Sequence, residues 1–374
     1  MNILLVDHAP FFGGAESFLL DLLTALDRQA FTPIIVTDPR SPVLERFVTI
    51  GEHVVTTPLP QINRSPIFPW RLLDAGAHLA RVARNERADV LHTFTARAHL
   101  IGAVAARMAS IPIVWRICDD TLPAWALSLF ARIPQRIVIV AVSRWITRYY
   151  PRLHLDGLVP DGARPPIDVS REHARAKLDL PRDALIVAHV GRLVRWKGQD
   201  IFIRALAQAA QTVPQVRGLI VGAWHKEDER SGPLGGGKSY YDELSALADQ
   251  LAAPVAFAGF VREPGYIYAA ADVVTHTSTS PEPFGRIVIE AMMAGCAVVA
   301  ANAGALPEIV MDGQTGILTP PGDANALANA LADLLTDANR RAQMGAAGKQ
   351  RAETEYTLAT MTHRMENTYR LAFG

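Results

Sequence analysis

The feature that most constrains the fold is an alternation of short β-branched runs with longer helical stretches. This alternation is typical of parallel α/β sheets, because a parallel connection needs a crossover that is usually a helix. A first series of strands is predicted at Asn2–Asp7, Pro33–Thr37, His53–Thr57, Val90–His92, Ile111–Ile117 and Ile137–Val142. The helices between them are predicted at Ala15–Leu26, Trp70–Asn85 and Ala96–Ala109.

A second series of the same kind follows a connecting segment. Its strands are predicted at Leu185–Val190, Gly218–Val221, Val255–Phe257, Asp272–Thr275, Ala297–Ala300 and Gly316–Leu318, with helices at about 198–211, 240–252, 285–294 and 324–336. The segment Pro151–Arg182 holds a Pro-Asp-Gly and a Pro-Pro, which predicts an interdomain connection. A length of 374 residues suits two domains. We therefore predict two doubly wound α/β domains, residues 1–165 and 166–351, that bind ligands at the carboxyl ends of their strands.

Composition excludes several classes of protein. The formal net charge is zero, so general attraction to nucleic acid is not expected. Cys118 and Cys296 have no paired spacing, so neither a disulfide scaffold nor a thiolate metal site is predicted. No apolar run reaches the length of a membrane span, and the chain starts directly on a strand pattern. We expect a cytoplasmic protein, at most peripheral to the inner face of a membrane.

One region of the chain has an excess of positive charge. Between Gln61 and Arg148 there are twelve Arg and five acidic residues. The excess is consistent with an anionic acceptor or membrane surface, and equally with solvated helix faces. Within it, Ile62–Leu73 mixes Arg with Ile, Phe and Trp, which suits either a lipid surface or a loop packed on its own domain. Trp224–Lys238 combines charges with a Gly run and predicts a surface loop.

Two carboxylates in the second half form the clearest candidate site. Glu282 and Glu290 are eight positions apart, and Pro283 disfavours helix at the residue before it. The pattern from Gly285 onward is helical and stops at Gly295, so Glu290 belongs to the second turn of a helix. The amides at such a helix start favour a phosphate, which leaves both carboxylates for hydroxyl groups. This arrangement suits a ligand that is both a sugar and a nucleotide.

The surrounding motifs resemble those of the retaining glycosyltransferases of family 4. The resemblance rests on Glu282–Gly285, Glu290, Gly295–Ala300, Gly304–Glu308 and Asp312–Gly316, in that order. It implies the GT-B fold, in which two Rossmann-like domains face each other across a deep cleft. The N-terminal domain then binds the acceptor and the C-terminal domain the nucleotide sugar. In that fold the final helix, here about Ala352 to Leu371, returns to the N-terminal domain, which adds residues 352–374 to it.

Loss of a nucleoside diphosphate builds negative charge on the leaving phosphates, so cations and N–H donors are needed there. Gly191–Gly198 follows the first strand of the second domain and resembles the family element whose Arg and Lys grip the diphosphate, here Arg192 and Lys197. Near the start, Gly13 and Gly14 open a helix and resemble the family loop that approaches the donor phosphates and the acceptor. Glycine permits such an approach because it has no Cβ.

The resemblance also assigns the remaining donor contacts. It implies that Glu290 holds the ribose and that Glu282, with the amides after Phe284, orients the transferred sugar. Phe260 and Val261 are expected to line the base. The full set of expected donor-binding residues is Gly13, Gly14, Arg192, Lys197, Phe260, Val261, Glu282, Phe284, Gly285, Arg286 and Glu290. No metal site and no resident cofactor are predicted, and the co-substrate is expected to be of UDP or GDP type.

The acceptor domain departs from the family pattern. Where many members have His-x-His, the chain has His92-Thr93-Phe94, and Cys118 stands where a further His is common. His92 is therefore the remaining candidate contact near the transferred sugar, with His99 a more distant one. The expected catalytic residues are Arg192, Lys197, Glu282 and His92.

The predicted activity is transfer of a sugar from a nucleotide-diphosphate sugar to a hydroxyl of a glycan, lipid-linked or small-molecule acceptor. Cell-surface polysaccharide or glycoconjugate biosynthesis is the expected context. Two alternatives stay open. The missing histidines suit a non-catalytic nucleotide-sugar-binding protein, and a pair of carboxylates suits a glycoside hydrolase. A hydrolase has no use for Arg192 and Lys197 beside a helix start.

Overall fold

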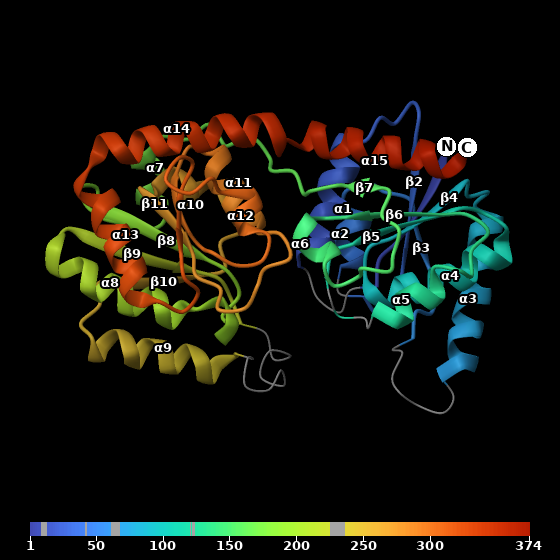
Figure 1. Ribbon diagram of the computed structural model, residues 1–374, viewed down its shortest axis with the longest axis horizontal. Coiled ribbons are helices and arrows are strands. Elements are labelled where there is room, and N and C mark those ends of the chain that lie inside the picture. Colours follow the sequence, from blue (N-terminus) through green and yellow to red (C-terminus); the bar gives the residue numbers. More distant parts are fainter. Residues whose placement is uncertain (9–12, 42, 61–67, 120, 122–123, 225–235) are drawn as a thin grey trace. The chain divides into compact units, whose positions relative to one another are not determined.

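The computed structural model describes residues 1–8, 13–41, 43–60, 68–119, 121, 124–224 and 236–374 (Figure 1). The chain forms two compact units: one is Met1–Gly162 with Leu358–Gly374, and the other is Ala163–Thr357. Half of Ile62–Leu73 and most of Trp224–Lys238 lie outside the described residues. The surface roles predicted for these two segments therefore stay predictions. No helix in the described ranges combines the length and apolar character that a membrane crossing requires.

The first unit contains a parallel sheet of seven strands in the order β3-β2-β1-β4-β5-β6-β7. The strands are β1 (Asn2–Val6), β2 (Thr32–Thr37), β3 (Val54–Thr56), β4 (Val90–Thr93), β5 (Ile113–Ile117), β6 (Ile137–Ala141) and β7 (Gly157–Leu158). The helices are α1 (Gly14–Ala25), α2 (Leu44–Thr49), α3 (Phe68–Asn85), α4 (Ala96–Ala109), α5 (Ala124–Phe130), α6 (Arg144–Thr147) and α15 (Leu358–Phe373).

The second unit contains a parallel sheet of six strands in the order β10-β9-β8-β11-β12-β13. The strands are β8 (Leu185–Val190), β9 (Val216–Val221), β10 (Val255–Gly259), β11 (Val273–His276), β12 (Ala297–Ala301) and β13 (Ile317–Thr319). The helices are α7 (Arg171–Lys177), the 3₁₀ turn η1 (Arg195–Lys197), α8 (Gln199–Thr212), α9 (Lys238–Gln250), α10 (Gly265–Ala270), α11 (Arg286–Met293), α12 (Leu306–Ile309), α13 (Ala324–Thr336) and α14 (Ala338–Glu355).

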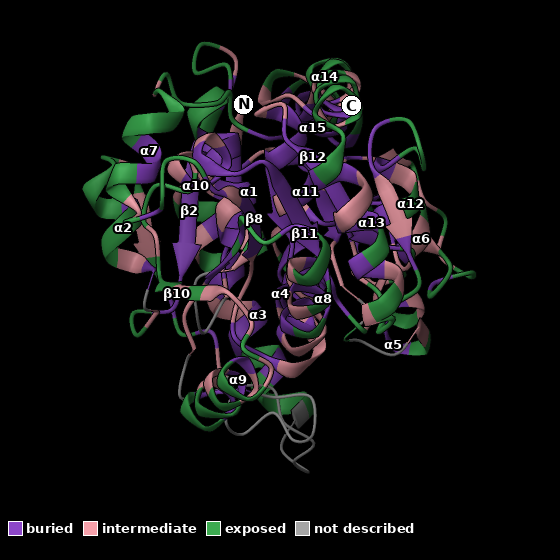
Figure 2. Cartoon of the chain, turned by 90° about the vertical axis from the view of Figure 1, so that its left-hand side faces the viewer, coloured by how far each residue is buried: buried purple, intermediate pink, exposed green. Residues whose placement is uncertain are grey.

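These two doubly wound units confirm the predicted fold class. The central strands of each sheet are buried because helices cover both faces, whereas the edge strands β3, β7 and β10 are partly exposed (Figure 2). Strand order reverses between β1 and β4 in the first sheet and between β8 and β11 in the second. A crevice opens at the carboxyl ends of the strands where such a reversal occurs, so these two points are where each unit is built to hold a ligand.

The predicted final helix at about Ala352 to Leu371 is wrong in its bounds. Two helices occupy this region, α14 and α15, and Tyr356 and Thr357 between them are not helical. Here the carbonyl of Tyr356 accepts a hydrogen bond of 2.7 Å from the amide of Ala163, and Thr357 pairs with Ala163 in an isolated bridge. These contacts with the interdomain segment replace helical hydrogen bonds, so the sequence pattern alone shows one helix where the structure has two.

Candidate functional site

The reversal of strand order in the second unit brings two loops together. β8 and β11 are parallel neighbours, with Val187 opposite Val273 and His189 opposite Thr275. Their carboxyl ends therefore lie at the same edge of the sheet. The loop after β8 carries Arg192 and Lys197, and the loop after β11 carries Glu282. Topology thus places the predicted phosphate-binding cations beside the predicted sugar-binding carboxylate.

The side chains of Lys197 and Glu282 meet directly. The ammonium Nζ of Lys197 donates a hydrogen bond to Oε1 of Glu282, and both side chains are largely buried, with exposed fractions of 16% and 12%. The other carboxylate oxygen, Oε2, is buried and has no hydrogen-bond partner among the described residues. A buried oxygen of this kind is costly unless something binds it, so Oε2 is a ready acceptor for a ligand hydroxyl.

His276, at the end of β11, is a further member of this cluster that the sequence analysis missed. Its Nε2 lies 3.6 Å from Oε1 of Glu282. Burial by itself raises the pKa of Glu282, but the Lys197 charge and the neighbouring His276 outweigh it and lower the pKa to about 2. Glu282 is therefore an anion throughout the neutral range.

Thr277 fastens the two loops to each other. Its hydroxyl donates to the carbonyls of Lys197, at 2.9 Å, and Gly198, at 2.8 Å. Nε2 of the buried His189 lies 2.9 Å from the same hydroxyl oxygen. Gly198 has a φ of +71°, and a Cβ on it would collide with the carbonyl oxygen of Thr277. The close approach that holds Lys197 in place therefore requires glycine here.

The motif at Gly304–Glu308 supports Glu282 from the other side. The amide of Ala305 donates a 2.9 Å hydrogen bond to the carbonyl of Glu282. Gly304 has a φ of +64°, and a Cβ on it would collide with the Glu282 backbone. This motif thus has a physical role: it fixes the backbone from which the Glu282 carboxylate projects.

Glu290 lies on α11, which starts after Gly285 as predicted. Gly285 is the N-cap, with a φ of +114°. The carboxylate of Glu290 accepts a 2.7 Å hydrogen bond from the hydroxyl of Tyr268, and its Oε1 lies 3.5 Å from Nη2 of Arg286. Burial and the neighbouring Glu290 charge raise the pKa of Tyr268, so the phenol stays a hydrogen-bond donor. Tyr268 and Arg286 together hold Glu290 in one orientation.

The other predicted donor contacts have diverse environments. Arg192 is half-buried, and its carbonyl accepts a 2.7 Å hydrogen bond from the side chain of Gln199. Phe260 is 68% exposed directly after β10, beside the half-buried Val261. Phe284 is buried, and its ring centroid lies 6.0 Å from that of Tyr356. The ring of Phe260 is therefore accessible to a ligand. The ring of Phe284 packs in the interior, so only the backbone of Phe284 can bind a ligand.

Gly13 and Gly14 stand at the start of α1, next to the reversal of strand order in the first unit. The Gly13 amide donates a 2.6 Å hydrogen bond to Oε2 of Glu16, which is the half of a capping box that a glycine N-cap can form. The φ of Gly13 is −142°, which any residue can adopt. Backbone strain therefore does not explain the glycine, and the donor contact expected of Gly13 and Gly14 stays a prediction.

His92 is the exception among the expected catalytic residues. Its side chain has no exposed surface, and the Tyr369 hydroxyl lies 2.9 Å from Nδ1. The rings of Phe18 and Phe94 pack against it as well. The enclosure arises because α15 covers β4, a contact that the strand pattern does not reveal. Nε2 of His92 is buried and has no hydrogen-bond partner among the described residues, and the catalytic role expected of His92 stays a prediction. His99 is buried too, with Nδ1 at 2.7 Å from the Thr93 hydroxyl.

Asp161 has a structural role. Its Oδ1 accepts a 2.6 Å hydrogen bond from Nη2 of Arg116, and the two side chains are 8% and 1% exposed. The guanidinium of Arg116 also lies 3.7 Å from the centre of the Phe18 ring. A buried arginine requires a counter-charge, so this Asp compensates Arg116 in the core of the first unit.

Three supporting residues, Tyr268, His276 and Thr277, were not identified from the sequence. His276 and Thr277 immediately precede the Ser-rich strand end, so their position next to the motif was the available signal. Tyr268 gives no such signal, because it reaches Glu290 from a different helix. Among the described residues, no group of three His, Cys, Asp or Glu side chains is placed to hold a metal ion.

Comparison with known families agrees with this geometry. Residues 170–351 match the profile described as glycosyl transferases group 1, and residues 12–160 match that of glycosyltransferase family 4. The chain belongs to the family 4 glycosyltransferases. The two matches follow the two units, and the group 1 match contains Arg192, Lys197, Glu282 and Glu290.

Curated relatives of this family 4 chain match over part of their length. A D-inositol 3-phosphate glycosyltransferase of Corynebacterium aurimucosum is 35% identical over 209 residues, which is 55% of this chain and 47% of that protein. A phosphatidyl-myo-inositol mannosyltransferase of Mycobacterium tuberculosis is 32% identical over 252 residues, or 66% of this chain and 63% of that protein. The chain thus matches about half of the length of the first curated relatives.

Solved structures resemble the family 4 chain over its whole length. Anabaena HepE in complex with UDP-glucose has a TM-score of 0.80 and 27% identity, and the match covers 99% of this chain and 100% of that one. A glycosyltransferase of Rickettsia africae has a TM-score of 0.85 at 18% identity and covers 99% of this chain and 98% of that one. These likenesses agree with the predicted GT-B fold class.

Proposed function

We propose that the protein is a retaining glycosyltransferase that uses a UDP- or GDP-type nucleotide sugar and needs no metal ion. The acceptor is a hydroxyl of a glycan, lipid-linked or small molecule in cell-surface polysaccharide or glycoconjugate synthesis. The observation that carries the proposal is the contact between Lys197 and Glu282 where strand order reverses in the second unit. A cation and a carboxylate held together there match the two halves of a nucleotide sugar.

Each part of the nucleotide sugar is bound by a different set of residues. Lys197 and Arg192 stabilise the negative charge that develops on the diphosphate as the bond to the sugar breaks. Oε2 of Glu282, buried and without a partner among the described residues, accepts a hydroxyl of the transferred sugar. Glu290, fixed by Tyr268, accepts the ribose hydroxyls. Phe260 supplies an exposed apolar surface beside the base.

The transfer itself needs no protein base. The bond between the anomeric carbon and the diphosphate breaks, and its electron pair stays on the phosphate oxygen. The acceptor oxygen attacks from the same face, and its proton passes to that phosphate oxygen, so the configuration is retained. A mechanism of this kind depends on placement and electrostatics. It is also compatible with the enclosed position of His92.

Two relatives support the donor class. The Anabaena neighbour was crystallised with UDP-glucose, and it shares 27% identity with this chain. The mycobacterial relative is a mannosyltransferase, so the sugar that it transfers differs from the glucose of that complex. We therefore propose a UDP- or GDP-hexose without choosing between them.

The test is a thermal-shift screen of the full chain against a panel that includes UDP-glucose and GDP-mannose. Turnover with the stabilising donor follows, and proton NMR gives the anomeric configuration of the product. We expect one nucleotide sugar to raise the midpoint temperature of thermal unfolding. With that donor, the product should have the same anomeric configuration as the donor. Inversion of configuration, or the absence of any stabilising nucleotide sugar, would contradict the proposal.

A non-catalytic nucleotide-sugar-binding protein is the second candidate. It is favoured by the burial of His92 together with Phe94 and Cys118 at positions where family members often have His. Tight binding of the donor without turnover over a broad acceptor panel distinguishes it from the enzyme.

A further inference from the structure

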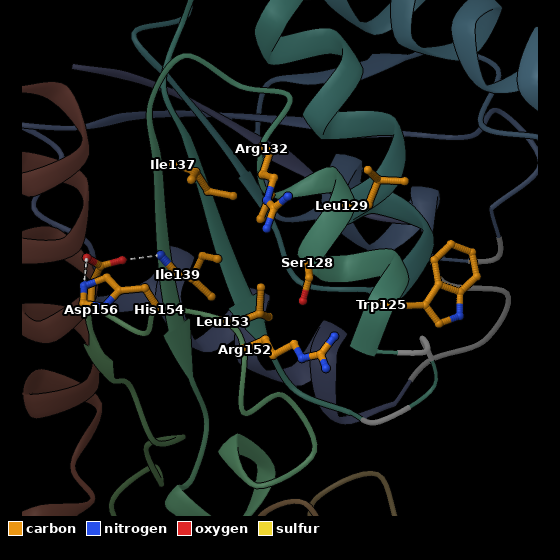
Figure 3. Close-up of a pocket in the computed structure, with 11 residues that line it drawn as sticks. Trp125, Ser128, Leu129, Arg132, Ile137, Ile139, Arg152, Leu153, His154 and Asp156 are labelled. Carbon is orange, nitrogen blue, oxygen red and sulfur yellow. Dashed lines mark hydrogen bonds and ion pairs between the residues drawn. The ribbon is translucent and has the colours of Figure 1, made fainter.

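A cavity of about 410 Å³ lies in the first unit, away from the carboxyl ends of its strands (Figure 3). It is bordered by α5, by the loop that leads into the first half of β6 and by the segment before β7. The lining residues are Trp125, Ser128, Leu129, Ala131, Arg132, Ile137, Ile139, Arg152, Leu153, His154 and Asp156. In a doubly wound sheet the main ligand site is at the opposite ends of the strands, so this cavity is a separate feature.

Three polar groups in the cavity have unused hydrogen-bonding capacity. Arg132 and Arg152 are exposed at the rim, and their guanidinium groups have neither an ion pair nor a hydrogen bond to any residue that the structure describes. The Ser128 hydroxyl oxygen is buried and likewise has no hydrogen-bond partner in the described ranges. Figure 3 shows Ser128 between the two arginines. Buried hydroxyls are normally satisfied, so this one points to a missing polar partner.

The single acidic side chain in the lining does not neutralise the arginines. Oδ2 of Asp156 accepts a 2.7 Å hydrogen bond from the amide of Ile139, and Oδ1 lies 3.7 Å from Nε2 of His154. Asp156 is thus committed to joining β6 to the segment before β7. The two arginines give the cavity an excess of positive charge.

The remainder of the lining is apolar. Ile137, Ile139 and Leu153 supply aliphatic surface inside the cavity. Trp125 and Leu129, both on α5, are 68% and 53% exposed. Exposed side chains of this size next to a cavity provide a contact area for an apolar ligand group.

We propose that this cavity binds an organic phosphate that carries an apolar group, with the phosphate on Arg132, Arg152 and Ser128. Guanidinium groups match phosphate oxygens with two parallel N–H donors each, and the serine hydroxyl supplies a further donor. The apolar substituent then lies on Ile137 and Leu153 and against Trp125. The proposal does not depend on the transfer reaction, because binding is measured without donor or acceptor.

Isothermal titration calorimetry of the full chain with phenyl phosphate tests the proposal, with inorganic phosphate and benzyl alcohol as the separate halves of the ligand. We expect saturable binding of phenyl phosphate that is stronger than that of either half. Arg132→Gln and Arg152→Gln should each weaken it about tenfold or more, since a hydrogen bond to a charged group is lost. Ser128→Ala should weaken it less.

Arg148→Gln is the matched control, because Arg148 is an exposed arginine of the same unit that does not line the cavity. It removes the same charge and should leave the affinity unchanged. Unchanged melting temperatures in all variants show that folding is retained. No saturable binding of phenyl phosphate, or equal weakening by Arg148→Gln, would overturn the proposal.

A second arm identifies the source of the phosphate. Sedimentation with vesicles of phosphatidylcholine containing phosphatidic acid is compared for the wild type and the two cavity arginine variants. Vesicle binding that is lost in the variants assigns the site to a lipid phosphate. Binding of phenyl phosphate without vesicle binding assigns it to a small organic phosphate.

Discussion

The ammonium of Lys197 donates a hydrogen bond to the carboxylate of Glu282, although the two residues are 85 positions apart in the chain. Each comes from the loop that follows one of two adjacent parallel strands, β8 and β11. The Thr277 hydroxyl binds the backbone next to Lys197, and Gly304 and Ala305 support the backbone of Glu282. The charges are therefore held in place before a ligand arrives, which is the condition for electrostatic catalysis.

Replacement of Lys197 by Ala is expected to lower kcat by ~10²–10³, the usual cost of removing one preorganised donor at a developing charge. The measurement is release of nucleoside diphosphate from the donor selected by the thermal-shift screen. Arg195→Ala is the control, because Arg195 lies in the same turn but pairs with the exposed Glu243. A Lys197 variant with wild-type turnover would remove this residue from the mechanism.

Replacement of Gly304 by Ala should impair the donor site through Glu282. The new Cβ collides with the Glu282 backbone, and the φ of +64° adds strain of ~1–2 kcal/mol. Gly313→Ala is a matched control, with a φ of +72° and no atom within 4 Å of its Cβ position. The Gly313 variant should lose only the stability that the φ strain costs, the Gly304 variant should lose more because of the collision, and donor affinity should fall in the Gly304 variant alone. Equal donor affinity in the two variants would contradict the supporting role of Gly304.

Replacement of Tyr268 by Phe removes the hydroxyl that binds Glu290. Because Glu290 is proposed to hold the ribose, KM for the donor should rise about tenfold, as expected for one hydrogen bond to a charged group. kcat should change little, since the ribose is bound alike in the ground state and the transition state. Steady-state kinetics at varied donor concentration separates the two parameters, and a loss confined to kcat would argue against the ribose assignment.

The pH dependence of stability should report the Glu282 cluster. The pKa of Glu282 falls from an ordinary 4.5 to about 2 in the folded chain. The stabilisation is therefore complete above the unfolded-state value and is lost as the pH falls from about 4.5 through about 2. Urea unfolding of the wild type and of Glu282→Gln between pH 6 and pH 2 measures it. The difference between the two proteins should shrink as the pH falls, and a constant difference would be inconsistent with this pKa.

Removal of the counter-charge from the buried pair of Arg116 and Asp161 should strongly destabilise the first unit. Asp161→Asn leaves the Arg116 charge buried without its counter-charge, which costs ~3–5 kcal/mol. The exposed pair of Arg182 and Glu172 provides a control, because Glu172→Gln should cost at most ~1 kcal/mol. Urea denaturation followed by circular dichroism measures both, and a cost for Asp161→Asn as small as that of the control would refute the prediction.

Local pattern predicted most of the strands and the order of the elements, because a buried parallel strand is a short apolar run whatever surrounds it. It also located Glu282, Glu290, Arg192 and Lys197, since these residues belong to contiguous motifs next to strand ends. The break between α14 and α15 was missed, because hydrogen bonding to Ala163 decides it and not the helical pattern. The enclosure of His92 was missed for a similar reason: a strand end gives no sign that Tyr369 will cover it.

The sequence by itself determined two parallel α/β domains and the loops that carry the charged residues of the site, because strand periodicity and motif spacing are local properties of the chain. Only the tertiary structure decided which side chains meet. The pairing of Lys197 with Glu282, the anchoring of Glu290 by Tyr268 and the enclosure of His92 all join residues far apart in the chain. Contacts of this kind depend on strand order and helix packing, which no local pattern encodes.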